Sequence, residues 1–207
     1  CSSTKNDKGE QNTKDELLTT FISKFDTLRL PLSIQRNDLH KYGNVDFDKV
    51  NRNDPKNPYY QTIDAKYYRY LENGTLDTLS SFYFLHAAHY NGFYIILYEQ
   101  ANESKESYWT KMNVLDNNGN IVDMLVLAGS KANTSEQYGQ IDNKWKVKTV
   151  LYSYLPDEPS IYALVADVVN EELGLTPDGH FKRTSSSKQK GYFNIVDDTL
   201  VPYKNNK

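Results

Sequence analysis

Residues 82–98, which read FYFLHAAHYNGFYIILY, decide the fold because two apolar runs meet at Asn91-Gly92. Both residues of an Asn-Gly pair accept a positive φ, which a two-residue turn between antiparallel strands requires. The stretch therefore predicts a hairpin, with its second strand running from Phe93 to Tyr98. Pairing across this turn places His86 opposite Leu97 and His89 opposite Tyr94.

Further hairpin signals follow along the chain. Strands are expected at 108–115 and 121–128 around the turn residues 116–120, then at 145–151, 161–169 and 192–196, with a turn at Pro177-Asp178-Gly179. No exact fixed-period repeat is visible, so successive hairpins favour an antiparallel meander. The run from Ile121 to Leu127 is apolar on both faces, which indicates that some strands are covered on both sides.

Two helices are expected before the strands. Thr13 and Glu16 fit a capping box, and apolar residues at helical spacing predict a helix over 14–25. Thr62 is expected to cap a second helix that ends at Asn73-Gly74. Its buried stripe is Ile63, Tyr67, Tyr70 and Leu71. The predicted class is α+β, mainly an antiparallel β meander (a curved sheet or a sandwich) with two N-terminal helices packed on it.

The segment between these helices has two parts. Leu28, Leu30, Leu32 and Ile34 alternate with other residues around Pro31, which predicts an extended segment at a sheet edge or outside the sheet. Residues 36–61 are polar and contain Asp54-Pro55 and Asn57-Pro58, which is typical of a long loop.

Composition and motifs exclude several classes of protein. The chain has 207 residues, with 24 Lys+Arg against 27 Asp+Glu. It therefore lacks the excess of positive side chains with which proteins bind the phosphate backbone of nucleic acids. No apolar run approaches the length of a membrane helix. Motifs for a serine nucleophile or a phosphate loop are absent. We therefore assign no catalytic, cofactor-binding or metal-binding residue, and we expect no nucleic-acid partner.

The single cysteine is Cys1, and the first apolar residue after it is Leu17. This start resembles the mature end of a bacterial lipoprotein, which implies lipid attachment at Cys1. We expect residues 1–13 to be a flexible tether and residues 14–207 to form one β-rich domain. The membrane would then be a partner through the lipid anchor. The alternative is a chain boundary that begins at cysteine by chance.

Two clusters suggest metal sites at first sight. His86 and His89 lie three apart, but positions three apart in a strand point to opposite faces. Asp116, Asn118 and Asn120 imitate the first half of a calcium loop, yet its sixth and twelfth positions hold Ile121 and Leu127 instead of Gly and Glu. Both clusters are better explained as strand and turn.

Aromatic residues make up 13% of the chain, with 17 Tyr, 8 Phe and 2 Trp. Strand propensity explains many of them. The alternative is a stacking surface for a sugar or a protein partner, since Tyr and Trp offer rigid amphipathic contact area. The candidate ligand contacts are Trp109, Trp145, Tyr59 and Tyr60.

Asp-Thr-Leu occurs three times, and each copy resembles the short O-glycosylation signal of exported Bacteroidetes proteins. Thr27, Thr78 and Thr199 are the candidate acceptors. Asp-Thr also suits turns and caps, and the sequence leaves both explanations open.

The whole pattern resembles the uncharacterised small β-rich lipoproteins of Bacteroidetes. The residues that carry the resemblance are Cys1 with its polar tether, the Leu30-Pro31-Leu32 step, and the segments at 91–98, 116–127 and 178–181. The resemblance implies the cell envelope and the outer membrane, on either face. It implies no reaction and supplies no catalytic residue.

These observations lead to three functional hypotheses. The first is a lipid-anchored, non-enzymatic envelope module that binds a glycan, a peptide or an envelope protein. The alternative is a hydrolase that acts on polysaccharide or cell wall through two carboxylates. The third is a structural assembly subunit, which predicts an exposed apolar patch or strand edge.

Overall fold

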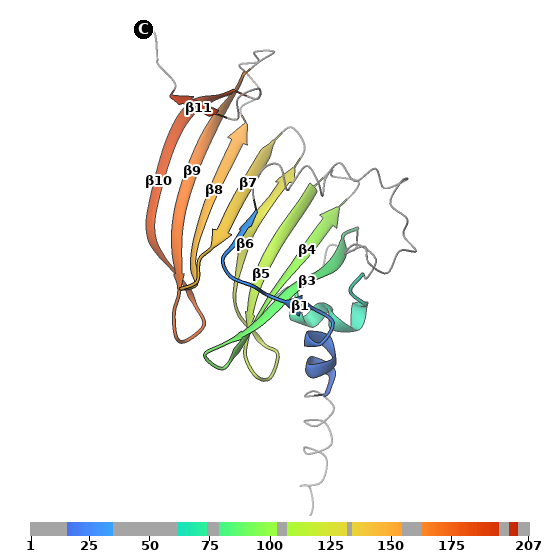
Figure 1. The fold of residues 1–207 in the computed structure, drawn as a ribbon. Helices are drawn as coiled ribbons and strands as arrows, with labels where there is room; N and C mark the ends of the chain where they lie inside the picture. Colours follow the sequence, from blue (N-terminus) through green and yellow to red (C-terminus); the bar gives the residue numbers. More distant parts are fainter. Residues whose placement is uncertain are drawn as a thin grey trace, which may run out of the picture.

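The computed structural model describes residues 16–34, 62–73, 79–102, 107–131, 134–154, 163–194 and 199–202. Within these residues, eleven strands form one open sheet (Figure 1). They are β1 (Asp26–Thr27), β2 (Leu32–Ile34), β3 (Ser81–Tyr90), β4 (Phe93–Asn102), β5 (Ser107–Leu115), β6 (Ile121–Lys131), β7 (Ser135–Ile141), β8 (Lys146–Tyr154), β9 (Ala163–Leu175), β10 (Phe181–Asn194) and β11 (Thr199–Pro202).

The strand order is β1-β3-β4-β5-β6-β7-β8-β9-β10-β11, and β2 pairs with β7 off this path. From β3 to β11 every neighbouring pair is antiparallel, which confirms the predicted meander. In the described part, the one parallel pair joins β1 to β3. The fold is mainly β, which corrects the expected α+β class.

The first hairpin has the predicted turn and the predicted register. Asn91 and Gly92 have φ angles of 49° and 84°, as a two-residue turn between twisted strands requires. His86 pairs with Leu97, and His89 pairs with Tyr94. The two histidine side chains therefore point to opposite faces of the sheet, as the strand geometry predicts.

Three later turns, at 116–120, 142–146 and 176–180, share one five-residue design. In each, the first N–H donates to the fifth carbonyl oxygen, and the fourth N–H donates to the first. The first side chain also accepts a bond from the fifth N–H. The fourth residue has a positive φ in every case, at Gly119, Trp145 and Gly179. The shared design is hard to see in the sequence, because the three turns are unequally spaced along the chain and the second has Trp145 where the others have glycine.

The ladder between β6 and β7 is short. It runs only from Gly129–Gln137 to Lys131–Ser135. Beyond it, the Gln137 side-chain amide donates to the carbonyl oxygen of Val126 at 2.6 Å, which replaces a lost ladder bond. The rest of β7 pairs with β2 instead. Since β2 directly follows Pro31 and pairs on one side only in the described part, the predicted edge segment is confirmed.

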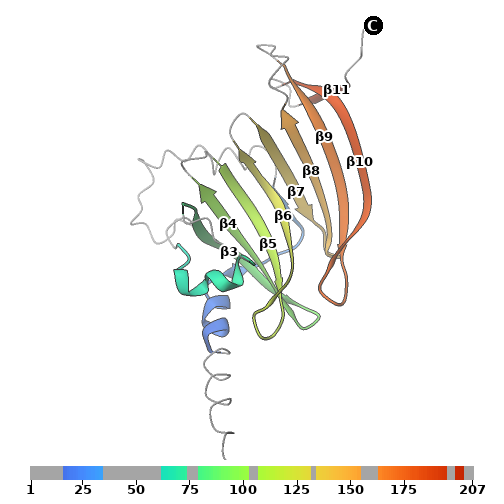
Figure 2. The same cartoon turned by 180° about the vertical axis from the view of Figure 1, so that it is seen from behind.

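One face of β3, β4 and β5 is covered by the helical residues 16–22 and by the 3-10 helix η2 (Ala65–Tyr70), as Figure 2 shows. Phe21 lies at the centre of this first cluster, with ring centroids 4.9 Å from Tyr70 and 5.1 Å from Tyr67. The buried members are Leu18, Phe21, Phe25, Ile63, Tyr67, Tyr70, Leu71, Phe82, Phe84, Ile96, Tyr98 and Leu115. Each large side chain buried here contributes about 1.5–3 kcal/mol.

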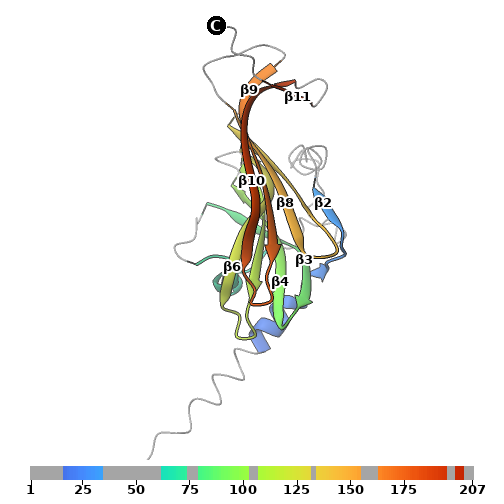
Figure 3. The same ribbon diagram turned by 90° about the vertical axis from the view of Figure 1, so that its left-hand side faces the viewer.

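After the first helix, the chain passes the β3 edge as β1 and continues on the opposite face. Figure 3 shows β2 and η2 on opposite sides of the sheet. Leu28, Leu30, Leu32 and Ile34 all pack into a second cluster there. Its other buried members are Ile95, Leu97, Met112, Val114, Leu127, Ile141, Trp145, Val147, Leu173 and Leu175. The expectation that some strands are covered on both faces is confirmed for β4.

The helical expectations need correction. Within the described residues the first helix spans 16–22, so it ends three residues before the expected position 25, although Phe25 still packs in the first cluster. Its expected start, with the Thr13 cap, lies outside the described residues. The second is a single 3-10 helix, and Asp64, not Thr62, precedes it. Thr62 instead forms an isolated bridge with Tyr83. The predicted stripe of Ile63, Tyr67, Tyr70 and Leu71 is buried as expected.

The short strands β1 and β11 were not expected from the sequence. Two longer strands were also missed almost entirely, because their residues are polar. They are β7 and most of β10, where only the end at 192–196 was expected. Residues 182–190 of β10 are exposed, and Arg183 and Lys188 pair with Glu171 and Asp167 on β9. In the part of the chain that the structure describes, no helix has the length and apolar character needed to cross a bilayer.

Candidate functional site

A hollow of about 580 Å³ lies on the face of the sheet over β4 to β8. Its lining is mostly amides, hydroxyls and lysines around one indole ring. The lining residues are Ser80, Gln100, Asn102, Ser107, Trp109, Lys111, Val126, Lys131, Ser135, Gln137, Leu151 and Ser153.

The register of the strands builds this lining as two rows. The first row is Gln100, Trp109, Gly129, Gln137 and Leu151, each paired with the next across the sheet. The second row is Asn102, Ser107, Lys131, Ser135 and Ser153. Because paired residues point to the same face of a sheet, five strands contribute side chains to one surface.

Trp109 forms the apolar floor of the hollow, and Gly129 beside it makes room for the ring. The indole is half-buried. A Cβ on Gly129 would overlap the Tyr108 carbonyl oxygen and lie 2.6 Å from Cε3 of Trp109. Gly129 also has a φ of 150°, which other residues rarely adopt. The glycine therefore lets the indole lie across β6 and show a ring surface to solvent.

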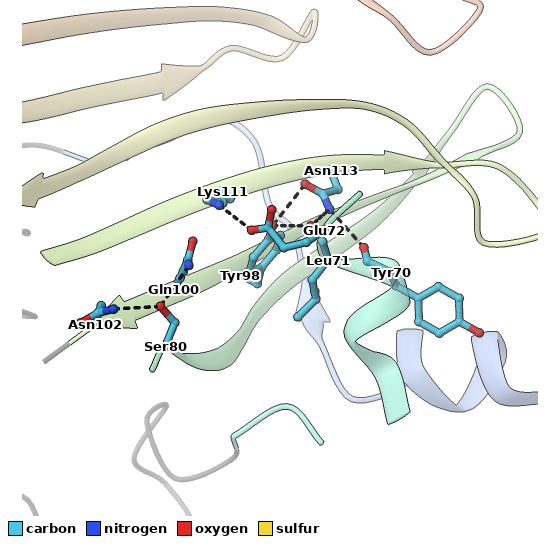
Figure 4. Close-up of polar contacts among 9 residues, drawn as sticks. All are labelled: Tyr70, Leu71, Glu72, Ser80, Tyr98, Gln100, Asn102, Lys111 and Asn113. Carbon is cyan, nitrogen blue, oxygen red and sulfur yellow. Dashed lines mark hydrogen bonds and ion pairs between the residues drawn. The ribbon is translucent and has the colours of Figure 1, made fainter. Parts of the chain in front are cut away.

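Ser80 orients two amides at the edge of the hollow (Figure 4). Its Oγ accepts from Gln100 Nε2 at 3.1 Å and from Asn102 Nδ2 at 3.5 Å. Ser80 and Asn102 are both buried. Gln100 and Gln137 each donate their amide N–H to the protein, and within the described residues their side-chain oxygens accept no hydrogen bond. Two acceptors therefore remain available to a ligand.

A buried polar network joins Lys111, a lining residue of the hollow, to the residues that follow η2. Figure 4 shows these contacts. Lys111 Nζ lies 2.5 Å from Glu72 Oε1, and both side chains are largely buried. Next to this pair, the Tyr98 hydroxyl donates to the Leu71 carbonyl oxygen at 2.7 Å. Burial, followed by the neighbouring Glu72 charge, raises the pKa of the Tyr98 hydroxyl far above its usual range. That hydroxyl stays protonated and acts as a fixed donor.

The structure separates the predicted aromatic contacts. Trp109 lines the hollow. Trp145 is only 9% exposed, and its ring packs on Tyr90 inside the second cluster, which argues against a role as a surface contact. Tyr59 and Tyr60 lie outside the described residues.

The predicted modification sites are also placed unevenly. Thr27 is exposed in β1, where it lies in the short parallel ladder with Ala87. Thr199 begins β11. Thr78 and Cys1 lie outside the described residues, so lipid attachment and the envelope location stay predictions.

Among the described residues, acidic side chains are distributed unevenly between two hollows. None of the described residues lining the hollow is Asp or Glu. Glu171 and Glu172 border a second hollow of about 380 Å³. There, hydrogen bonds from Lys146 and then Lys148 lower the pKa of Glu172, whereas a general acid needs a raised pKa. Among the described residues, no group of three His, Cys, Asp or Glu side chains is placed to hold a metal.

The Asp116 turn is confirmed as a turn. Its carboxylate accepts from the N–H groups of Asn118 and Asn120, both at 2.8 Å, and from the Asn120 side chain. Partial burial raises the pKa of the Asp116 carboxyl, but these hydrogen bonds outweigh burial and hold the pKa below its usual range. The carboxylate is thus occupied by the turn itself.

Sequence reasoning missed most of the lining. Gln100 and Asn102 follow an apolar run with spacing i, i+2, which was a usable signal of a polar strand face. Gln137, Ser135 and Lys131 gave no signal, because β7 was not recognised as a strand. No family model, curated protein or solved structure matches this chain.

Proposed function

We propose that this chain is a binding module and that the hollow over β4 to β8 takes a carbohydrate. One observation carries the proposal: a half-buried indole, Trp109, lies in the same lining as amides and hydroxyls from neighbouring strands. A sugar ring has an apolar C–H face that packs on an aromatic ring, and its hydroxyls both donate and accept hydrogen bonds. This lining offers both kinds of contact.

The lining is also held in place before a ligand arrives. Ser80 fixes Gln100 and Asn102, and the β6 backbone fixes Gln137 through two carbonyl oxygens. Side chains that are already ordered lose less conformational entropy on binding. This supports direct recognition of sugar hydroxyls by the two glutamine oxygens.

Other ligand classes fit the hollow less well. An extended peptide binds a sheet through a free strand edge, whereas β4 to β8 are paired with one another around the hollow. A lipid chain needs an apolar pocket, whereas among the described residues three apolar side chains, Trp109, Val126 and Leu151, line this one. A two-carboxylate hydrolase needs acids that the described lining lacks.

Calorimetric titration of the full chain with a panel of soluble oligosaccharides tests the proposal. We expect saturable binding of at least one oligosaccharide and an affinity at least tenfold lower for Trp109→Ala, which corresponds to about 1.4 kcal/mol. Tyr152→Ala is the matched control, because Tyr152 pairs with Glu136 and points to the opposite face from Leu151. No binding at millimolar concentrations, or equal loss in both variants, would overturn the proposal.

A further inference from the structure

The hollow carries positive charge without a matching negative charge in its described lining. Lys111 and Lys131 both line it, and no described lining residue is acidic. The two lysines differ in their surroundings, and this difference indicates the charge of the ligand.

Lys111 is already neutralised. Its ammonium group contacts the Glu72 carboxylate at 2.5 Å, and the pair is largely buried, with side-chain exposures of 17% and 22%. A short, partly buried ion pair of this kind is held by a charge-assisted hydrogen bond. Lys111 therefore positions Glu72 and η2 and adds little net charge to the hollow.

Lys131 has no counter-ion among the described residues. It is exposed at the end of β6, in the row between Ser107 and Ser135. The acid nearest along that row is Asp167, the partner of Ser153, and its carboxylate is bound to Lys188 at 3.0 Å. Within the described part of the chain, the Lys131 ammonium thus remains a cation without an acidic partner at the hollow.

The backbone positions of Lys131 and Trp109 in the sheet suit a single small ligand. Lys131 is one strand over from Trp109 and two residues beyond Gly129, the residue that pairs with Trp109. Strand spacing and residue rise place the Cα atoms of Trp109 and Lys131 roughly 8 Å apart. A saccharide whose ring packs on Trp109 can therefore direct a substituent towards Lys131.

We infer that the ligand is an acidic saccharide, with a carboxylate or sulfate group that pairs with Lys131. This inference rests on the proposed carbohydrate function and adds the charge of the ligand to it. A lysine is a compact point charge with rotatable donors, so it pairs with either anion. Its contribution weakens as ionic strength rises, because the site is open to solvent.

Matched pairs of ligands test the inference. Oligogalacturonate is titrated beside its fully methyl-esterified form, and a sulfated oligosaccharide beside its desulfated form, in low and in high salt. We expect the acidic member of at least one pair to bind tenfold or more tightly than the neutral member, with the difference shrinking in high salt. Lys131→Met is expected to abolish the difference, and Lys131→Arg to retain it.

Lys182→Met is the control, because Lys182 is exposed on β10 and outside the hollow. The outcomes separate the inference from the proposed function. Equal binding of both members of every pair, or an unchanged preference in Lys131→Met, would overturn the acidic ligand and leave the carbohydrate site standing. No binding of any member would overturn the carbohydrate site itself.

Discussion

Tyr98 and Asn113 donate to the same oxygen atom. The Tyr98 hydroxyl and the Asn113 side-chain amide lie 2.7 Å and 2.8 Å from the Leu71 carbonyl oxygen. Asn113 also donates to the Tyr70 carbonyl oxygen at 3.1 Å. A helix end has carbonyl groups without partners inside the helix. Here the buried side chains of Tyr98 and Asn113, on neighbouring strands, donate hydrogen bonds to these carbonyl groups and so attach η2 to the sheet.

This sharing predicts unequal effects of two substitutions. Tyr98→Phe removes one donor and leaves Leu71 bonded to Asn113, so it should cost about 1 kcal/mol of stability. Asn113→Ala leaves the Tyr70 carbonyl without its side-chain donor and opens a small cavity, so it should cost about 2–4 kcal/mol. Urea denaturation of both variants and of the double variant measures the costs and their coupling. Equal costs with no coupling would contradict the shared-acceptor arrangement.

Gly129 and Gly174 form a second matched pair. Gly129→Ala places a Cβ against the Tyr108 carbonyl oxygen and the Trp109 ring at a positive φ, so it should destabilise the fold by about 1–3 kcal/mol and displace the indole. Around Gly174 there is open space. Gly174→Ala should therefore change stability by less than about 1 kcal/mol. Denaturation and tryptophan emission together check both effects, and similar behaviour of the two variants would contradict the close approach of Trp109.

Glu99 should make stability fall as pH rises. Burial raises the pKa of its carboxyl to about 7, and the side chain is 6% exposed. The folded state then binds more protons than the unfolded state between the ordinary Glu pKa and about pH 7, so stability is lost across that window, by about 3 kcal/mol. Glu99→Gln should flatten the profile between pH 4.5 and 7.5, measured by urea denaturation. Glu16→Gln, at an exposed position, is the control and should leave the pH profile unflattened. If the dependence of stability on pH is the same in Glu99→Gln as in the unmodified chain, the raised pKa of Glu99 is refuted.

Asp116 should act in the opposite direction and at lower pH. Its pKa is held low in the folded state, on balance by the turn hydrogen bonds, so its contribution is present above the ordinary Asp pKa and lost as pH falls through the lowered value. Asp116→Ala should cost about 1 kcal/mol at pH 7. The cost should shrink towards pH 2. Asp64→Asn, an aspartate without a side-chain cap bond, serves as the control, and a cost for Asp116→Ala that is independent of pH would contradict the turn model.

The sequence predicted the elements whose side chains alternate or whose turns carry Asn-Gly or Asp-rich signals. The two predicted β3–β4 pairs, His86 with Leu97 and His89 with Tyr94, were right, because the turn length determines the register next to it. The irregularity between Phe84 and His86, which shifts the register beyond these pairs, was not predicted. Strand β7 was missed, since Ser135–Ile141 is almost wholly polar and forms a strand only because β8 and β2 lie beside it. The second helix was wrong in type, because packing of Tyr67 and Tyr70 decides it more than a cap does.

The candidate site was predictable in one residue. The sequence predicts both Trp109 and Trp145 as aromatic ligand contacts, and the structure places only the first of these two in the hollow. Trp145 lies in the second cluster, because its backbone takes the left-handed conformation of a turn, with a φ of 60°. Gln137 and Lys131 join Trp109 through pairing across neighbouring strands, which composition and spacing along the chain do not encode.

The amino-terminal segment that passes the β3 edge has a consequence for biosynthesis. β2 needs β7 as its partner, and β7 emerges from the ribosome about a hundred residues later. At 5–20 residues per second, this delay is on the order of 5–20 s. Until then, the apolar side chains of Leu32 and Ile34 lack part of the second cluster against which they pack. Folding of this part of the sheet therefore depends on contacts between segments far apart in the sequence, which form slowly.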